Sequence, residues 1–167
     1  MITLRQATAE DALLISRIIA CSWRGAYREI IDPLYLARLP DEYWLPSMRA
    51  WLDSGRLYGC IAEQDSLPVG CIIYGRGRDE NHADWGEIVS LYLLPEVMGK
   101  GIGGILLSEA LSALQEDDYH RVYLWAIQGN ARAERFYQRH GFVMTEERVH
   151  YKIGSDEVTD VRFVREG

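Results

Sequence analysis

A glycine-rich stretch, MGKGIGG at residues 98–104, holds residue types that bind phosphate through the main chain. It follows the apolar run GEIVSLYLL at residues 86–94, which has the composition of a buried strand, and it precedes apolar residues spaced as on one face of a helix. A strand, a glycine loop and a helix direct several backbone N–H groups and the positive end of the helix dipole to one place. The sequence therefore predicts a phosphate site, to which Lys100 adds a positive charge.

Two other nucleotide-binding motifs fail on these residues. Gly99, Gly101 and Gly104 satisfy the spacing G-x-G-x-x-G, but a dinucleotide fold ends its next strand in an acidic residue, and here RVYLWAIQ ends in Gln128. The phosphate loop of nucleotide hydrolases needs Ser or Thr after its lysine, where this chain has glycine. A nicotinamide-dependent oxidoreductase is therefore disfavoured, and a tight turn that binds nothing stays the simple alternative.

The composition of the whole chain limits the classes of protein to consider. Its 167 residues, 48% of them hydrophobic, predict one globular domain spanning residues 1–167. The three cysteines are scattered, the N-terminus does not look like a leader, and no apolar run approaches the roughly 20 residues that cross a bilayer. These features predict a cytoplasmic protein without a membrane partner. The net charge of -7 argues against nucleic acid, and the four histidines lack metal-ligand spacing, so no metal is expected.

Hydrophobic periodicity and turn residues predict an α/β protein. Helices are expected from near Thr8, where TAED resembles a capping box, to about residue 27, and over residues 41–54, 102–114 and 130–140. Strands are expected over residues 2–7, 58–64, 68–75, 86–94, 121–128, 142–153 and 157–166, with a turn at Asp65 and a surface loop over residues 75–84. The prediction is a mixed sheet of about seven strands with about four helices.

Two ordered blocks resemble a known family. The first is MGKGIG, similar to the pattern Q/R-x-x-G-x-G/A except that Met98 stands where Gln or Arg is usual. The second is NARAERFYQRHGF at residues 130–142, similar to N-x-x-A-x-x-F-Y-x-x-x-G-F. Together with the order of elements, these blocks resemble the GNAT superfamily of acetyl-coenzyme A-dependent N-acyltransferases over nearly the whole chain. The resemblance implies a mostly antiparallel sheet that is splayed at the cofactor site.

The resemblance also implies a role for particular residues. The glycine loop would hold the pyrophosphate of coenzyme A, and the main chain of the preceding strand would pair with the pantetheine arm. Tyr137 would place its hydroxyl beside the thioester sulfur, although a tyrosine that only packs in the core stays an alternative. The cofactor-binding residues implied are Leu91, Leu93, Gly99, Lys100, Gly101, Ile102, Gly103, Gly104, Asn130 and Tyr137.

The resemblance implies an N-acetyltransferase that moves acetyl directly from acetyl-coenzyme A to an amine. The acceptor would be a primary amine of a small molecule or of a peptide or protein N-terminus, and the segment CSWRGAYREIIDPLYL at residues 21–36 resembles a wall of the acceptor site. Glu87 is the candidate base, with an ion-pair partner or a solvated strand residue as the alternative. Met98 motivates a second hypothesis, a non-catalytic acyl-coenzyme A binding module. A homodimer is compatible with the sequence.

Overall fold

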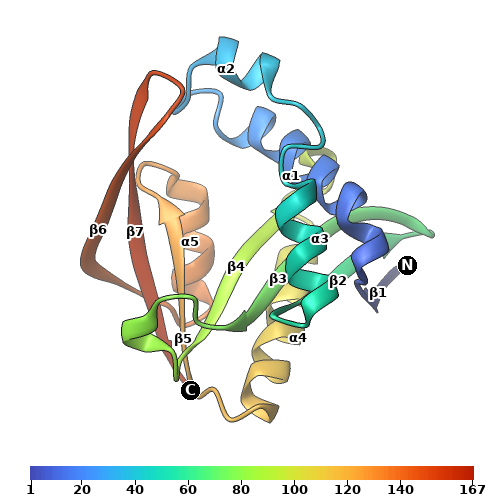
Figure 1. The fold of residues 1–167 in the computed structure, drawn as a ribbon, viewed down its shortest axis with the longest axis vertical. Helices are drawn as coiled ribbons and strands as arrows, with labels where there is room; N and C mark the ends of the chain where they lie inside the picture. Colours follow the sequence, from blue (N-terminus) through green and yellow to red (C-terminus); the bar gives the residue numbers. More distant parts are fainter.

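A computed structural model describes residues 1–167, which form one seven-stranded sheet (Figure 1). Its strand order is β1-β2-β3-β4-β5-β7-β6, and only the β4–β5 pair is parallel. The strands are β1 (Ile2–Gln6), β2 (Leu57–Gln64), β3 (Leu67–Arg76), β4 (Gly86–Leu93), β5 (Arg121–Ile127), β6 (Val143–Ile153) and β7 (Asp156–Glu166). The predicted mixed, mostly antiparallel sheet of seven strands is confirmed.

Five α-helices flank the sheet, one more than predicted. They are α1 (Ala12–Ala26), α2 (Pro33–Arg38), α3 (Leu45–Ser54), α4 (Ile102–Glu116) and α5 (Ala131–Arg139). The unpredicted helix is α2, which has only six residues and so shows no apolar periodicity. It begins where the Asp32 carboxylate accepts a hydrogen bond from the Leu34 N–H, with proline at the first helical position. A single buried side chain, Leu36, attaches it to the core.

The helices cover both faces of the sheet, with α1 and α3 on one face and α4 and α5 on the other (Figure 1). The alternation of side chains along β3 explains this arrangement. Cys71 and Ile73 pack with α1 and α3, whereas Ile72 between them packs with α4. These side chains are fully buried, so β3 is the centre of two hydrophobic cores. No helix is both long and apolar enough to span a membrane.

Two short sequence signals, the capping box that begins at Thr8 and the turn at Asp65, are confirmed. The Thr8 N–H donates to the Asp11 carboxylate over 2.8 Å, and a 3-10 turn over Ala9–Asp11 leads into α1. At the β2–β3 hairpin, Asp65 and Ser66 both have positive φ, which the predicted turn requires.

The sheet opens between β4 and β5. These two strands pair only from Gly86–Val122 to Ile88–Leu124. Beyond that point β4 contains a bulge at Val89, because Ile73 pairs with Ser90 and Tyr74 with Ile88. From there β4 stays paired with β3 and β5 with β7, but not with each other. The predicted splay of the sheet is therefore present, and its edges carry unpaired main-chain groups.

Candidate active site

The glycine loop lies at the end of β4 and leads into α4. Gly99 and Gly101 have φ of +79° and +85°, a conformation that side chains with a Cβ rarely adopt. No side chain caps α4, whose first helical bond runs from the Ile105 N–H to the Gly101 carbonyl over 3.3 Å. The N–H groups of the first turn, from Ile102 to Gly104, therefore have no partner within the helix. Free N–H groups at a helix N-terminus can bind an anion.

The other two glycines of the loop serve packing. A Cβ on Gly103 would lie 3.3 Å from the Phe136 ring, and one on Gly104 would lie 3.2 Å from Nε2 of His140. These glycines therefore allow α5 to pack closely against the first turn of α4. A Cβ on Gly101, in contrast, would meet nothing within 4 Å, so its glycine is required by φ alone.

Two cations lie at this loop. Lys100 is exposed and forms no ion pair. Arg132 reaches the loop from α5, and its Nη2 lies 3.2 Å from the position that a Cβ on Gly99 would take. The sequence reading assigned Lys100 but missed Arg132, although Arg132 lies two positions after Asn130 in the second block. Together with the free N–H groups, these cations suit a pyrophosphate.

The main chain of β4 continues from the opening to the loop. Leu91 pairs with Ile72 and Leu93 with Gly70 on the β3 side only, so their other edge is free. Their side chains, and that of Ile102, pack in the core on the α4 face. An extended ligand can therefore pair with this edge as an additional strand.

Asn130 and Tyr137 come from the second block. The Asn130 side-chain oxygen accepts a hydrogen bond from the Ala133 N–H over 3.2 Å and so caps α5. The Tyr137 ring makes an edge contact with Phe142 at a centroid distance of 5.8 Å. Burial, followed by the nearby Tyr92, raises the pKa of Tyr137 far above its usual value. The Tyr137 side chain packs against the core on the α4 face.

Glu87 is fully engaged in hydrogen bonds and only 1% exposed. One carboxylate oxygen accepts from the Arg78 main-chain N–H, from Arg78 Nε and from the Tyr123 hydroxyl, each over 3.0 Å. The other oxygen accepts from Arg78 Nη2 over 2.7 Å. The structure therefore shows Glu87 as the ion-pair partner of Arg78, which was one of the alternatives for this residue. The Arg78 guanidinium also lies 5.4 Å from the centre of the Trp51 ring.

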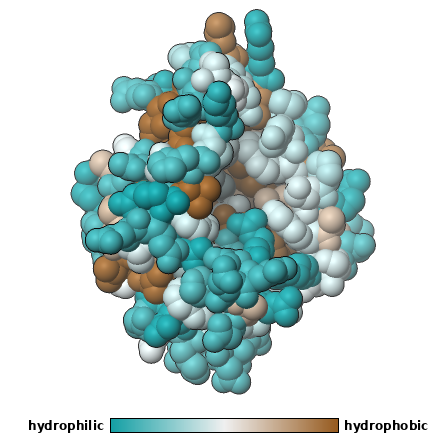
Figure 2. Space-filling model, turned by 60° about the vertical axis from the view of Figure 1, so that its left-hand side comes forward, coloured by the Kyte–Doolittle hydropathy of each residue, from teal (hydrophilic) through white to brown (hydrophobic).

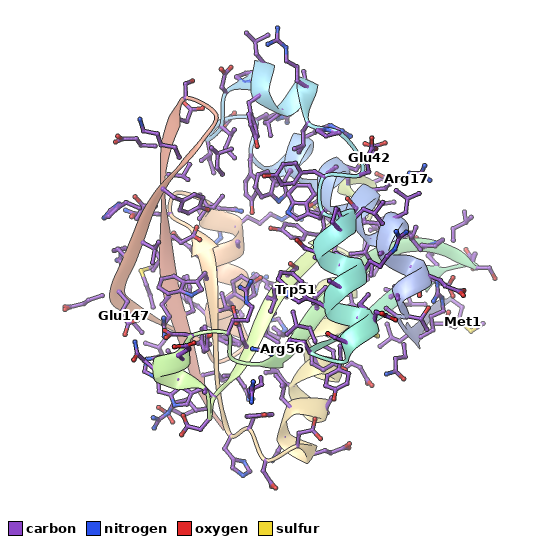
Figure 3. The ribbon with its side chains drawn as sticks, viewed as in Figure 1. Met1, Arg17, Glu42, Trp51, Arg56 and Glu147 are labelled. Carbon is purple, nitrogen blue, oxygen red and sulfur yellow. The ribbon has the colours of Figure 1, made fainter.

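A chain of charges extends from this pair along the same face. Asp79 accepts from Arg162 over 2.6 Å, and Glu147 lies 2.8 Å from Nε of Arg162. The Arg162 guanidinium stacks at 4.6 Å on Tyr123 and at 4.4 Å on the Trp125 ring. Figure 3 shows Glu147 on β6 and Trp51 on α3, at opposite sides of this face. Each of these acids is therefore neutralised by an arginine.

A second group of polar side chains converges on the opening from the α1 face. Tyr27 and Tyr92 lie near each other, and the Tyr151 hydroxyl donates to the Asp160 carboxylate over 3.0 Å. The indole N–H of Trp23 is buried without a hydrogen-bond partner. Figure 2 shows a hollow near the middle of the face that carries β6 and β7. Four elements, α1, β4, β6 and β7, supply these five side chains of the candidate acceptor site.

The sequence reading placed the wall of the acceptor site in residues 21–36 and missed the other members of this group. Within that segment, Tyr27 is buried beside Ile31 and Leu36. Tyr92 could have been found, because strand alternation between Leu91 and Leu93 directs it to the opposite face. No local sequence pattern identifies Tyr151 and Asp160, because their contact depends on the register between β6 and β7.

A mixed sheet that opens between two parallel strands, with a glycine loop at the opening, is the arrangement that the sequence resemblance implied. Residues 23–142 match the model of the acetyltransferase (GNAT) family. The chain belongs to this family and is an acyltransferase.

Curated relatives and solved structures agree with this assignment. An N-acetyltransferase of Mycobacterium tuberculosis, Rv2669, is 33% identical over 93% of this chain and 97% of its own. YuaI of Bacillus subtilis, also named an N-acetyltransferase, is 30% identical over 78% of this chain and 74% of its own. The fold matches PaiA N-acetyltransferase from Thermoplasma acidophilum in complex with coenzyme A, with a TM-score of 0.77, 22% identity, and coverage of 100% of this chain and 99% of that one.

Proposed function

We propose that this chain transfers the acetyl group of acetyl-coenzyme A to a primary amine of a small molecule or of a peptide N-terminus, by direct attack within a ternary complex. The observation that carries the proposal is the opening between β4 and β5. The glycine loop lies at one end of this opening, and a group of tyrosines lies beside it on the α1 face. A donor and an acceptor could therefore meet in the opening. The free, largely buried cysteines agree with a reducing, cytoplasmic location.

The donor would use groups that are otherwise unpaired. The N–H groups from Ile102 to Gly104 would bind the pyrophosphate, with Lys100 and Arg132 neutralising its charge. The free edge at Leu91 and Leu93 would pair with the amides of the pantetheine arm. Solved structures with this fold support the choice of donor, since PaiA holds coenzyme A and YncA of Salmonella typhimurium, with a TM-score of 0.73, holds acetyl-coenzyme A.

Tyr137 would act on the leaving group. The amine nitrogen attacks the thioester carbonyl, the new C–N bond forms, and the C–S bond breaks to release a thiolate, while the proton lost from the nitrogen passes to a base or to water. A tyrosine of ordinary pKa protonates a thiolate of pKa about 8.5 uphill by roughly 2 kcal/mol. Burial raises the pKa of Tyr137 further, so the hydroxyl keeps its proton and stabilises the departing sulfur by donating a hydrogen bond.

The acceptor must reach the site as a neutral amine. At pH 7 deprotonation costs about 4 to 5 kcal/mol for a lysine-like amine but only about 1 to 1.4 kcal/mol for a peptide α-amine. Glu87 as the base stays a prediction. Its four hydrogen bonds support a second role, in which Glu87 holds Arg78 and Tyr123 in place at the start of β4.

Thiol release with acetyl-coenzyme A and a panel of primary amines and α-amino peptides tests the proposal. The expected result is acceptor-dependent release that Tyr137→Phe strongly reduces and Tyr58→Phe does not, because Tyr58 is an exposed tyrosine remote from the opening. Isothermal titration with coenzyme A measures donor binding separately. Coenzyme A binding without thiol release in the presence of any acceptor would overturn the transfer step. Absence of coenzyme A binding would overturn the choice of acetyl-coenzyme A as the donor.

A further inference from the structure

One carboxylate at the opening lacks a cation. Asp160 lies on β7 opposite Ile127, the last residue of β5, and is partly exposed. Its neighbour on the same face, Val158, packs with Tyr27, the residue that follows α1, and this places Asp160 on the acceptor side of the sheet. Burial raises the pKa of Tyr92 on β4, and the charge of Asp160 adds to this rise although β5 stands between their strands in the order of the sheet. The Asp160 charge therefore acts across the opening.

The charges around Asp160 differ from those of the other acids on this face. Glu87 is paired with Arg78, and both Asp79 and Glu147 are paired with Arg162. Asp160 forms no ion pair, and its one hydrogen bond comes from the neutral Tyr151 hydroxyl. The two strands beside it place Ile127 and Val149 opposite it in register, so neither supplies a charge at that position. A negative charge at a half-buried position is therefore left without compensation.

The surroundings of Asp160 suit an organic cation. The Tyr151 hydroxyl lies at the carboxylate, and Tyr27 and Tyr92 belong to the same group of aromatic side chains. The buried indole N–H of Trp23 has no partner in the same group of side chains. A carboxylate combined with aromatic rings is a favourable environment for an ammonium group, which gains both an ion pair and contacts with the ring faces.

We propose that the Asp160 carboxylate binds an ammonium group of the acceptor and that Tyr151 holds this carboxylate in place. The inference rests on the proposed transferase function and names the acceptor class, a cationic amine. An acceptor that carries a carboxylate next to its amine would be repelled, because Asp160 already supplies a negative charge there. The ammonium is either the tail of a diamine or the reacting group before it loses its proton.

The test compares three acceptors of similar length: butylamine, diaminobutane and aminobutanol. Asp160→Asn keeps the shape of the side chain and its bond with Tyr151 but removes the charge. Glu157→Gln is the matched control, since Glu157 is an exposed acid of the same strand with no hydrogen bond or ion pair. Kinetics at saturating acetyl-coenzyme A give KM and kcat, and the shift of melting temperature caused by each amine in the presence of coenzyme A gives binding without turnover.

Asp160→Asn is expected to raise KM about tenfold or more, with a smaller change in kcat, because a charge-assisted bond to the acceptor is lost. A rise for diaminobutane alone assigns the tail ammonium, and an equal rise for all three acceptors assigns the reacting ammonium. Tyr151→Phe should raise KM in the same direction but less. Unchanged KM and unchanged amine-induced shifts in Asp160→Asn would overturn the inference, as would a wild type that binds none of the amines.

Stability separates this role from a structural one. Burial raises the pKa of Asp160, so its folded-state value lies above the unfolded one and the ionised carboxylate costs stability as the pH rises through that folded value. Asp160→Asn should therefore melt no lower than the wild type at pH 7 in the absence of amine. A clear loss of melting temperature would assign Asp160 to structure alone. Coenzyme A binding in the same variants shows whether the transferase function stands independently.

Discussion

Replacing Glu87 by glutamine tests which of its two roles this buried carboxylate has. The exchange keeps the shape of the side chain but turns one oxygen into an NH2 group. If that NH2 takes the place of the oxygen now 2.7 Å from Arg78 Nη2, two donors face each other and one charge-assisted hydrogen bond is lost. Such a loss costs about 1.5 to 3 kcal/mol. For a chain of this length, each kcal/mol lowers the melting temperature by about 2 to 4 °C, so Glu87→Gln should melt about 3 to 12 °C lower.

Two measurements on the same variants decide the question. Calorimetry on Glu87→Gln, Arg78→Gln and the double variant should give a coupling energy of about 1 kcal/mol or more, because the two side chains act as one unit. If Glu87 is also the base, the rate of Glu87→Gln with a lysine-like acceptor should fall selectively at low pH. A Glu87→Gln variant with unchanged melting temperature would refute the structural role of Glu87. An unaltered pH profile would reject Glu87 as the base.

Three further substitutions test other parts of the site and fold. Tyr137→Phe should lower kcat about tenfold or more with little change in coenzyme A affinity, and unchanged turnover would remove Tyr137 from the mechanism. Gly101→Ala should cost about 1 to 2 kcal/mol in the free energy of unfolding, because φ is +85° there, and should weaken coenzyme A binding in titration. The Arg5 hydrogen bonds lower the pKa of Asp11, so this stabilisation is present above about pH 4 and lost as the pH falls. Denaturation of Asp11→Asn should accordingly show a stability loss at pH 7 that shrinks in acid.

The sequence predicted best the parts of the site whose structure is local. Each strand, the glycine loop and the helices that bear the two blocks are marked by residues within a few positions of one another, such as Pro95 at the end of β4 and Gly141 after α5. Positive φ at Gly99 and Gly101 likewise follows from a loop that must turn sharply. In contrast, α2 was missed because six residues with one buried side chain carry no periodic signal.

The contacts that the sequence could not supply join distant segments. Glu87 was recognised as a chemically useful acid, but its partner Arg78 is brought to it by the loop between β3 and β4. Asp79, at the start of that loop's helical turn, is held by Arg162, 83 positions along the chain. Asp160 and Tyr151 meet only through the register of β6 and β7. Such pairings depend on the folded sheet, and no spacing within either segment reveals them.

The opening in the sheet explains why function and stability are linked at this site. Where β4 and β5 part, each strand loses one set of ladder hydrogen bonds, and buried main-chain groups without partners are costly. The bulge at Val89 helps to separate the strands and leaves β3 to hold β4 in place. A ligand that supplies amides along this edge offsets the cost of the opening. Three acids at one end are neutralised by arginines, whereas Asp160 at the other end is not. If Asp160 binds the acceptor as proposed, only its end of the opening attracts a cation.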